Sequence, residues 1–86
     1  MKISVELTLT PLHNEFEQPI IDFIIKLRVS GLTVLENPLS TQVYGDYDKV
    51  MSLLTTEIKN TFELLDNGLL FMKIVKSDRS DYEPFF

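Results

Sequence analysis

The sequence predicts an α+β fold in which two helices cover one face of a four-stranded antiparallel sheet, in the order β-α-β-β-α-β of the ferredoxin-like sandwich. Three observations predict it. Residues 2–10 alternate between polar and apolar, two later segments repeat apolar residues at helical spacing, and short turn signals separate the segments. The chain has 86 residues, so we expect one small domain over residues 1–86.

The first strand is expected over residues 2–11, followed by a loop and a helix. The strand should bury Ile3, Val5, Leu7 and Leu9 and turn Ser4, Glu6, Thr8 and Thr10 to the opposite face. The helix is expected to begin near residues 16–18, because Pro19 is tolerated only in a first turn. Its apolar stripe is Phe16, Ile20, Phe23, Ile24 and Leu27, and Gly31 should lie just beyond its end.

A hairpin, a second helix and a last strand complete the pattern. Residues 32–36 and 39–44 are expected as strands around an Asn37-Pro38 turn that is too short for parallel pairing. Gly45 should end the strand and Asp46 should cap the second helix. The apolar stripe of that helix is Val50, Leu54, Ile58 and Phe62, and the fourth strand should run over residues 69–75.

In the usual strand order of this fold, strands one and three are central and strand four lies beside strand one. Alternation then directs Leu39, Thr41, Val43, Leu70, Met72 and Ile74 toward the helices. The other face, called the open face below, collects Glu6, Thr8, Thr10, Ser40, Gln42, Tyr44, Phe71, Lys73 and Val75. Because this face would leave Phe71 and Val75 in water, we expect it to be covered by a second copy, with or without a ligand pocket between the copies.

Composition excludes several classes of function. The chain has no cysteine, which excludes disulfides, cysteine-bound metals and thiol chemistry. Its net charge of −5 argues against nucleic-acid binding, which needs clustered Lys and Arg. No signal peptide and no apolar run of membrane-spanning length is recognisable, so we expect no membrane partner and a cytoplasmic location.

Catalytic and metal chemistry find little support in the residues. Asp46 and Asp48 lack a locally spaced third ligand, so no metal site is expected. His13 is the only histidine, and it has no neighbouring nucleophile or orienting acid. A ferredoxin-like monooxygenase acting on an aromatic substrate would need His13 to face a pocket.

Three segments resemble the YkoF-like thiamine-binding family, whose members are small cytosolic proteins of ferredoxin-like fold. They are VELTLTPL at 5–12, PLSTQVYGDYDKV at 38–50 and IVKSDRSD at 74–81, and they keep the family's order and spacing. The resemblance implies that the chain is not an enzyme, carries no cofactor, forms a homodimer or homotetramer, and binds thiamine or its hydroxymethylpyrimidine half in thiamine salvage or homeostasis. The sequence departs from the family at His13 and Ser40, where glycine is common.

Under that resemblance the ligand-binding residues are expected to be Glu6, Thr8, Thr10, Ser40, Thr41, Gln42, Tyr44, Phe71 and Lys73. Glu6 is expected to accept a hydrogen bond from the aminopyrimidine, and the alternative is that it only pairs with Lys73 on a neighbouring strand. Tyr44 or Phe71 would stack on a flat ring or on the thiazolium cation.

The alternative function is a structural or regulatory homo-oligomeric interaction module with no metabolite ligand. A vitamin-binding protein should have a pocket bordered by Glu6 and aromatic rings, whereas an interaction module should bury these groups against protein.

Overall fold

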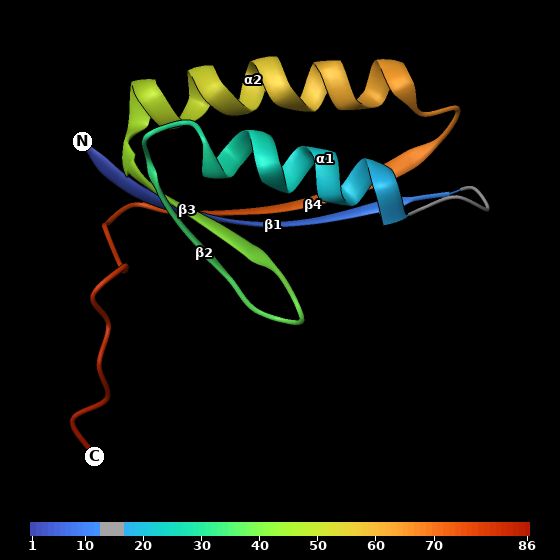
Figure 1. Ribbon diagram of the computed structural model, residues 1–86. Coiled ribbons are helices and arrows are strands. Elements are labelled where there is room, and N and C mark those ends of the chain that lie inside the picture. Colours follow the sequence, from blue (N-terminus) through green and yellow to red (C-terminus); the bar gives the residue numbers. More distant parts are fainter. Residues whose placement is uncertain (13–16) are drawn as a thin grey trace.

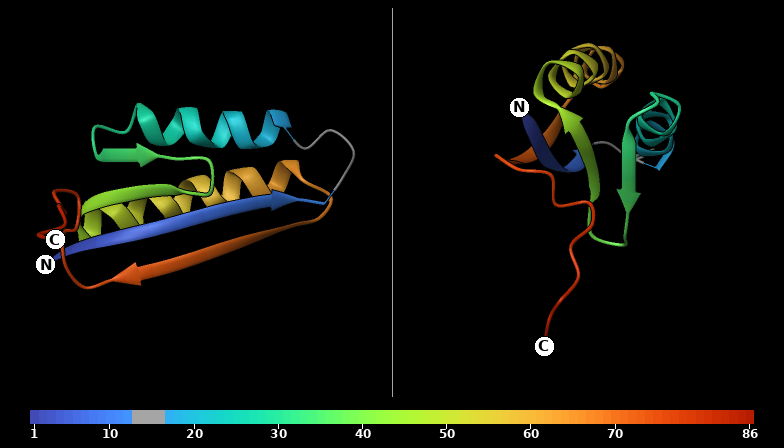
Figure 2. Two further views of the ribbon diagram at one scale, coloured as in Figure 1. Left: turned by 90° about the horizontal axis from the view of Figure 1, so that it is seen from below. Right: turned by 90° about the vertical axis from the view of Figure 1, so that its left-hand side faces the viewer.

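The structure, a computed structural model, describes residues 1–12 and 17–86 and has the predicted order of elements (Figure 1). The strands are β1 (Lys2–Pro11), β2 (Thr33–Glu36), β3 (Thr41–Asp46) and β4 (Gly68–Val75), and the helices are α1 (Glu17–Arg28) and α2 (Tyr47–Leu64). The sheet order is β2-β3-β1-β4, and every neighbouring pair is antiparallel. Both helices lie on the same side of the sheet in Figures 1 and 2, which confirms the ferredoxin-like α+β fold. His13 and Phe16 lie outside the described residues.

The core lies between the helices and the inner face of the sheet. It is made of Ile3, Val5, Leu7, Phe23, Leu27, Val43, Val50 and Leu54, which are all buried. The β1 and β3 members follow the predicted alternation, and the helix members fall on the predicted stripes. The polar residues of β1 therefore face away from the helices, as the pattern requires.

The predicted boundaries of β3 were wrong by two residues at each end. At its start, the Asn37 side-chain oxygen accepts hydrogen bonds from the backbone amides of Leu39 and Ser40, at 2.8 and 2.9 Å. Those amides therefore belong to the turn and not to the sheet ladder. At its end, Gly45 continues the strand opposite Ile3 with a φ of 155°, a conformation that glycine adopts easily.

Asp46 holds the predicted N-cap position of α2, but the prediction that its side chain caps the helix was wrong. Asp46 precedes α2, but its side chain makes no capping hydrogen bond. Its carboxylate lies 3.2 Å from the ammonium of Lys2, which lowers the pKa of Asp46. The Tyr47 amide at the helix start donates instead to the carbonyl of Met1, at 2.8 Å. The cation on the paired strand thus takes the carboxylate that a cap would have used.

The edge position of β4 leaves its inner face partly uncovered. Met72 and Ile74 alternate toward the helices as predicted, since Leu7 and Val5 are their partners in β1, but both side chains remain partly exposed. Phe62, the last residue of the α2 stripe, is partly exposed for the same reason. The fully buried core therefore ends before β4, where Leu70 packs against it while partly buried, and an apolar surface remains between α2 and this strand.

Candidate ligand-binding site on the open face

A cavity of about 200 Å³ lies on the open face, near the start of β1 and the end of β4. Its lining includes four of the predicted site residues, Glu6, Gln42, Tyr44 and Lys73, which come from β1, β3 and β4. They meet there because Glu6 pairs with Gln42 on one side and with Lys73 on the other. We call this cavity the open-face pocket. It is completed by Ser4, Val5, Val75 and Arg79.

A chain of hydrogen bonds orients the Glu6 carboxylate. The Gln42 side-chain amide donates to the Ser40 hydroxyl at 2.7 Å, and this hydroxyl donates to Glu6 Oε2 at 3.0 Å. Lys73 Nζ lies 3.6 Å from Glu6 Oε1, so the predicted alternative, a cross-strand ion pair, is present. Both side chains of that pair remain well exposed, and the carboxylate keeps room for a further donor.

The turn after β4 forms one wall of the pocket and is held by Ser4. Ser4 is 7% exposed, and its hydroxyl donates to the carbonyl of Ser77 at 2.7 Å. The same oxygen accepts the backbone N–H of Arg79 at 2.8 Å. The Arg79 guanidinium, which donates to the Ser77 hydroxyl at 2.8 Å, is thereby placed at the pocket. Within residues 1–12 and 17–86 it forms no salt bridge.

Tyr44 lies on the open face but is largely covered, with 9% of its surface exposed. Burial raises the pKa of its hydroxyl, and the nearby carboxylates of Asp78 and Glu6 raise it further. The Asp78 carboxyl has a lowered pKa because the hydroxyl and the backbone amide of Ser80 donate to it. Tyr44 therefore offers the pocket a neutral hydroxyl and part of a ring, beside the carboxylates of Asp78 and Glu6.

Some predicted site residues do not reach the pocket. Thr41 faces the helices and is buried, because it pairs with Leu7. Thr8 donates a long hydrogen bond to the carbonyl of Leu39, at 3.4 Å, and Thr10 pairs with Leu69 still further along the strand. Phe71 is on the open face and 65% exposed, but it does not line the pocket.

Four pocket residues were missing from the predicted set: Ser4, Val5, Val75 and Arg79, of which Ser4 and Arg79 are polar. For Ser4 a signal existed, because alternation places it on the same face as Glu6. Arg79 comes from a turn whose position depends on contacts with residue 4, at the far end of the sequence. No local pattern contains that information.

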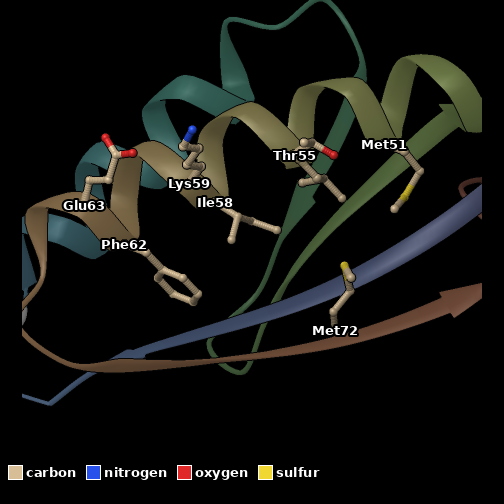
Figure 3. A pocket seen from close by; sticks show the side chains of 8 residues that line it. Met51, Thr55, Ile58, Lys59, Phe62, Glu63 and Met72 are labelled. Atoms are coloured by element: carbon tan, nitrogen blue, oxygen red, sulfur yellow. The ribbon is translucent and has the colours of Figure 1, made fainter.

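A second, larger cavity of about 510 Å³ lies between α2 and the inner side of β4 (Figure 3). We call it the α2–β4 groove. It is lined by Met51, Leu54, Thr55, Ile58, Lys59, Phe62, Glu63 and Met72. In Figure 3 the side chains of Phe62 and Ile58 point from the helix toward Met72 on the strand. The groove is mainly apolar, and its one lining carboxylate, Glu63, has no hydrogen bond within the described residues, so the open-face pocket is the better site for a polar ring.

Among the residues that the structure describes, no three His, Cys, Asp or Glu side chains come together in a way that could hold a metal ion. The described helices are too short or too polar for a membrane span.

Comparison with known proteins supports the fold at low sequence identity. No family model and no curated protein matches the chain. Among solved structures, a candidate thiamine biosynthesis/salvage protein from Thermotoga maritima is similar with a TM-score of 0.81 and 18% identity, over 90% of this chain and 85% of that chain. A Streptococcus pneumoniae protein has a TM-score of 0.84 and 25% identity, over 91% of this chain and 89% of that chain. DUF77, a domain of unknown function from Bacillus cereus, has a TM-score of 0.76 and 10% identity, over 95% and 82%.

Proposed function

We propose that this chain binds thiamine or a hydroxymethylpyrimidine-type precursor, without catalysing a reaction, as a homo-oligomer that serves thiamine salvage or homeostasis. The observation that supports the proposal most is the Glu6 carboxylate in the open-face pocket, oriented by Ser40 at 3.0 Å. An aminopyrimidine presents an N–H donor beside a basic ring nitrogen. A fixed carboxylate accepts from the donor and stabilises the protonated ring, through charge-assisted hydrogen bonds of the stronger kind.

The ion pair with Lys73 does not block this role. Both partners are well exposed at a separation of 3.6 Å, and surface ion pairs contribute about 0–1 kcal/mol. A ligand amine that reaches Glu6 at shorter range therefore displaces the ammonium at little cost. Lys73 can then turn toward solvent, because it lies on the edge strand.

The size of the pocket favours the pyrimidine half of the vitamin. Pockets for drug-sized ligands usually enclose about 300–1,000 Å³, whereas the open-face pocket encloses about 200 Å³. One ring fits this volume, and a second ring would extend over the open face toward Phe71. Phe71 is 65% exposed, and in this proposal it stacks on that second ring.

The comparisons add support of a more general kind. One solved structure with this fold is described as a candidate thiamine biosynthesis/salvage protein. At 18% identity it shares the fold, and the assignment of a thiamine-type ligand to this chain is our proposal.

The alternative, an interaction module without a metabolite, is favoured by one observation. Outside the pocket, the open face exposes Phe71 and Leu69, and apolar groups in this position are typical of protein interfaces. Both proposals include self-association, and they differ in whether Glu6 contacts a ligand.

The test is titration calorimetry with thiamine, thiamine phosphate and hydroxymethylpyrimidine. Glu6→Gln keeps the shape of the side chain and removes its charge, so we expect affinity to fall at least tenfold. Glu17→Gln, on the exposed first turn of α1, is the matched control and should bind like the unmodified chain. If the folded, ligand-free protein gives no saturable heat with any of the three compounds, the interaction module becomes the better proposal.

A further inference from the structure

The segment 81–86 carries three aromatic side chains that contact little of the described protein. Phe85 and Phe86 are 99% and 94% exposed, and Tyr82 is also mostly in solvent. The two phenyl rings contact each other edge to face, with centroids 5.6 Å apart. Two adjacent phenylalanines in water are unfavourable, so this segment needs a partner surface.

The segment leads away from the helices of its own chain. Ser4 holds the preceding turn on the open-face side, and the Tyr82 amide donates to the carbonyl of Arg79 at 3.1 Å. From there the chain runs away from the helices in Figure 1 and in the right-hand view of Figure 2. Pro84 has a fixed φ and biases Glu83 toward extended conformations. The four residues after Tyr82 span at most about 14 Å, and they are directed away from the α2–β4 groove.

The surface of the α2–β4 groove is complementary in chemistry to the segment 81–86. Its floor is apolar, with Phe62 and Met72 partly exposed, and its volume of about 510 Å³ has room for phenyl rings (Figure 3). Its wall carries one cation, Lys59, and one carboxylate, Glu63, and neither forms a salt bridge within the described ranges 1–12 and 17–86. The aromatic segment brings carboxylates at Asp81 and Glu83 next to its rings.

We propose that the segment 81–86 of one copy docks into the α2–β4 groove of a second copy, with the phenyl rings against Phe62 and Met72 and Glu83 beside Lys59. The exchange is reciprocal, so each copy gives one segment and receives one, which closes a two-fold dimer. This inference specifies the self-association in the proposed function and is independent of the ligand.

The absence of cysteine allows a direct test by spin labelling. A label is attached at Thr56→Cys, on the exposed side of α2 beside the groove, and this protein is mixed with unmodified chain labelled with ¹⁵N. We expect the amide signals of Glu83, Phe85 and Phe86 to broaden, because only a contact between two copies brings the label near them. A label at Val29→Cys, at the far end of α1, is the matched control and should leave these signals sharp.

Analytical ultracentrifugation then measures how much the two phenyl rings contribute to dimer affinity. We expect Phe85→Ala/Phe86→Ala to raise the dimer dissociation constant at least tenfold, while Val29→Ala, which also removes an exposed apolar side chain, leaves it unchanged. A dimer that survives the double substitution, or a label at residue 56 that does not broaden the segment, overturns the docking proposal and leaves self-association intact. A chain that stays monomeric at millimolar concentration overturns both the docking proposal and the proposed self-association.

Discussion

Ser4→Ala should weaken the whole fold, although it removes a single oxygen from the edge of the candidate site. The Ser4 hydroxyl donates to Ser77 and accepts from Arg79, and it thereby joins the start of β1 to the turn after β4. Alanine fits the same space. The substitution therefore isolates the two hydrogen bonds from any change in packing.

The expected loss follows from those two bonds. Each intramolecular hydrogen bond contributes about 0.5–1.5 kcal/mol to stability, and a donor or acceptor that is left unpaired and out of water costs about 1–3 kcal/mol. The turn lies at the surface and can rehydrate in part, so we expect a destabilisation of about 1–2 kcal/mol. For a domain of this size each kcal/mol lowers the melting temperature by about 4–8 °C.

Urea unfolding at one fixed protein concentration measures this loss, because oligomers change stability with concentration. Ser52→Ala, on the exposed side of α2, is the control, and it should be neutral or slightly stabilising. Hydrogen exchange should also become faster at the Arg79 amide. A change below about 0.3 kcal/mol with unchanged exchange at Arg79 would mean that Ser4 does not hold the turn.

Three further predictions concern the core and the response to pH. Leu27 is 0% exposed, so Leu27→Ala should lower the free energy of unfolding, measured in urea, by about 2–5 kcal/mol. Leu64 is 82% exposed, so Leu64→Ala should lower it by less than about 0.5 kcal/mol. Arg28 donates a hydrogen bond to Glu36 at 2.6 Å and lowers the pKa of Glu36 below its ordinary 4.5. Glu36→Gln should therefore be less stable than the unmodified chain above pH 4.5, and this difference should disappear as the pH falls through the lowered pKa. The pKa of Tyr44 is raised above 10.0, so stability should fall as pH rises beyond that value, and Tyr44→Phe should reduce this fall in thermal scans; an equal fall in both proteins would contradict the assignment.

The fold could be predicted from sequence because its information is local. Alternation in β1 and the two helical stripes each need only a few neighbouring residues, and short turns leave few ways to connect them. The start of β3 was misplaced for a local reason, since the Asn37 side chain binds the amides of Leu39 and Ser40. The error at Asp46 arose because a distant group competes with a local signal. Asp46 has the sequence of a helix cap, but Lys2 on the paired strand binds its carboxylate.

The candidate site was predictable only in part, for the same reason. The alternation of side chains along each strand placed Glu6, Gln42 and Lys73 on one face, and the antiparallel register then brought them together. The position of the pocket along that face depends on where the turn after β4 lies, and this is set by the contact with Ser4. The inclusion of Arg79 follows from that contact.

The most direct test of the proposed function is to map where hydroxymethylpyrimidine binds, by NMR titration of ¹⁵N-labelled protein. Our proposal predicts saturable shifts that cluster around the open-face pocket, in the backbone amides near Ser4 and Arg79 and in the side-chain amide of Gln42. The same titration of Glu6→Gln should need at least tenfold more ligand. Shifts that cluster instead along the α2–β4 groove, or no saturable shift at any site, would contradict a carboxylate-centred binding site on the open face.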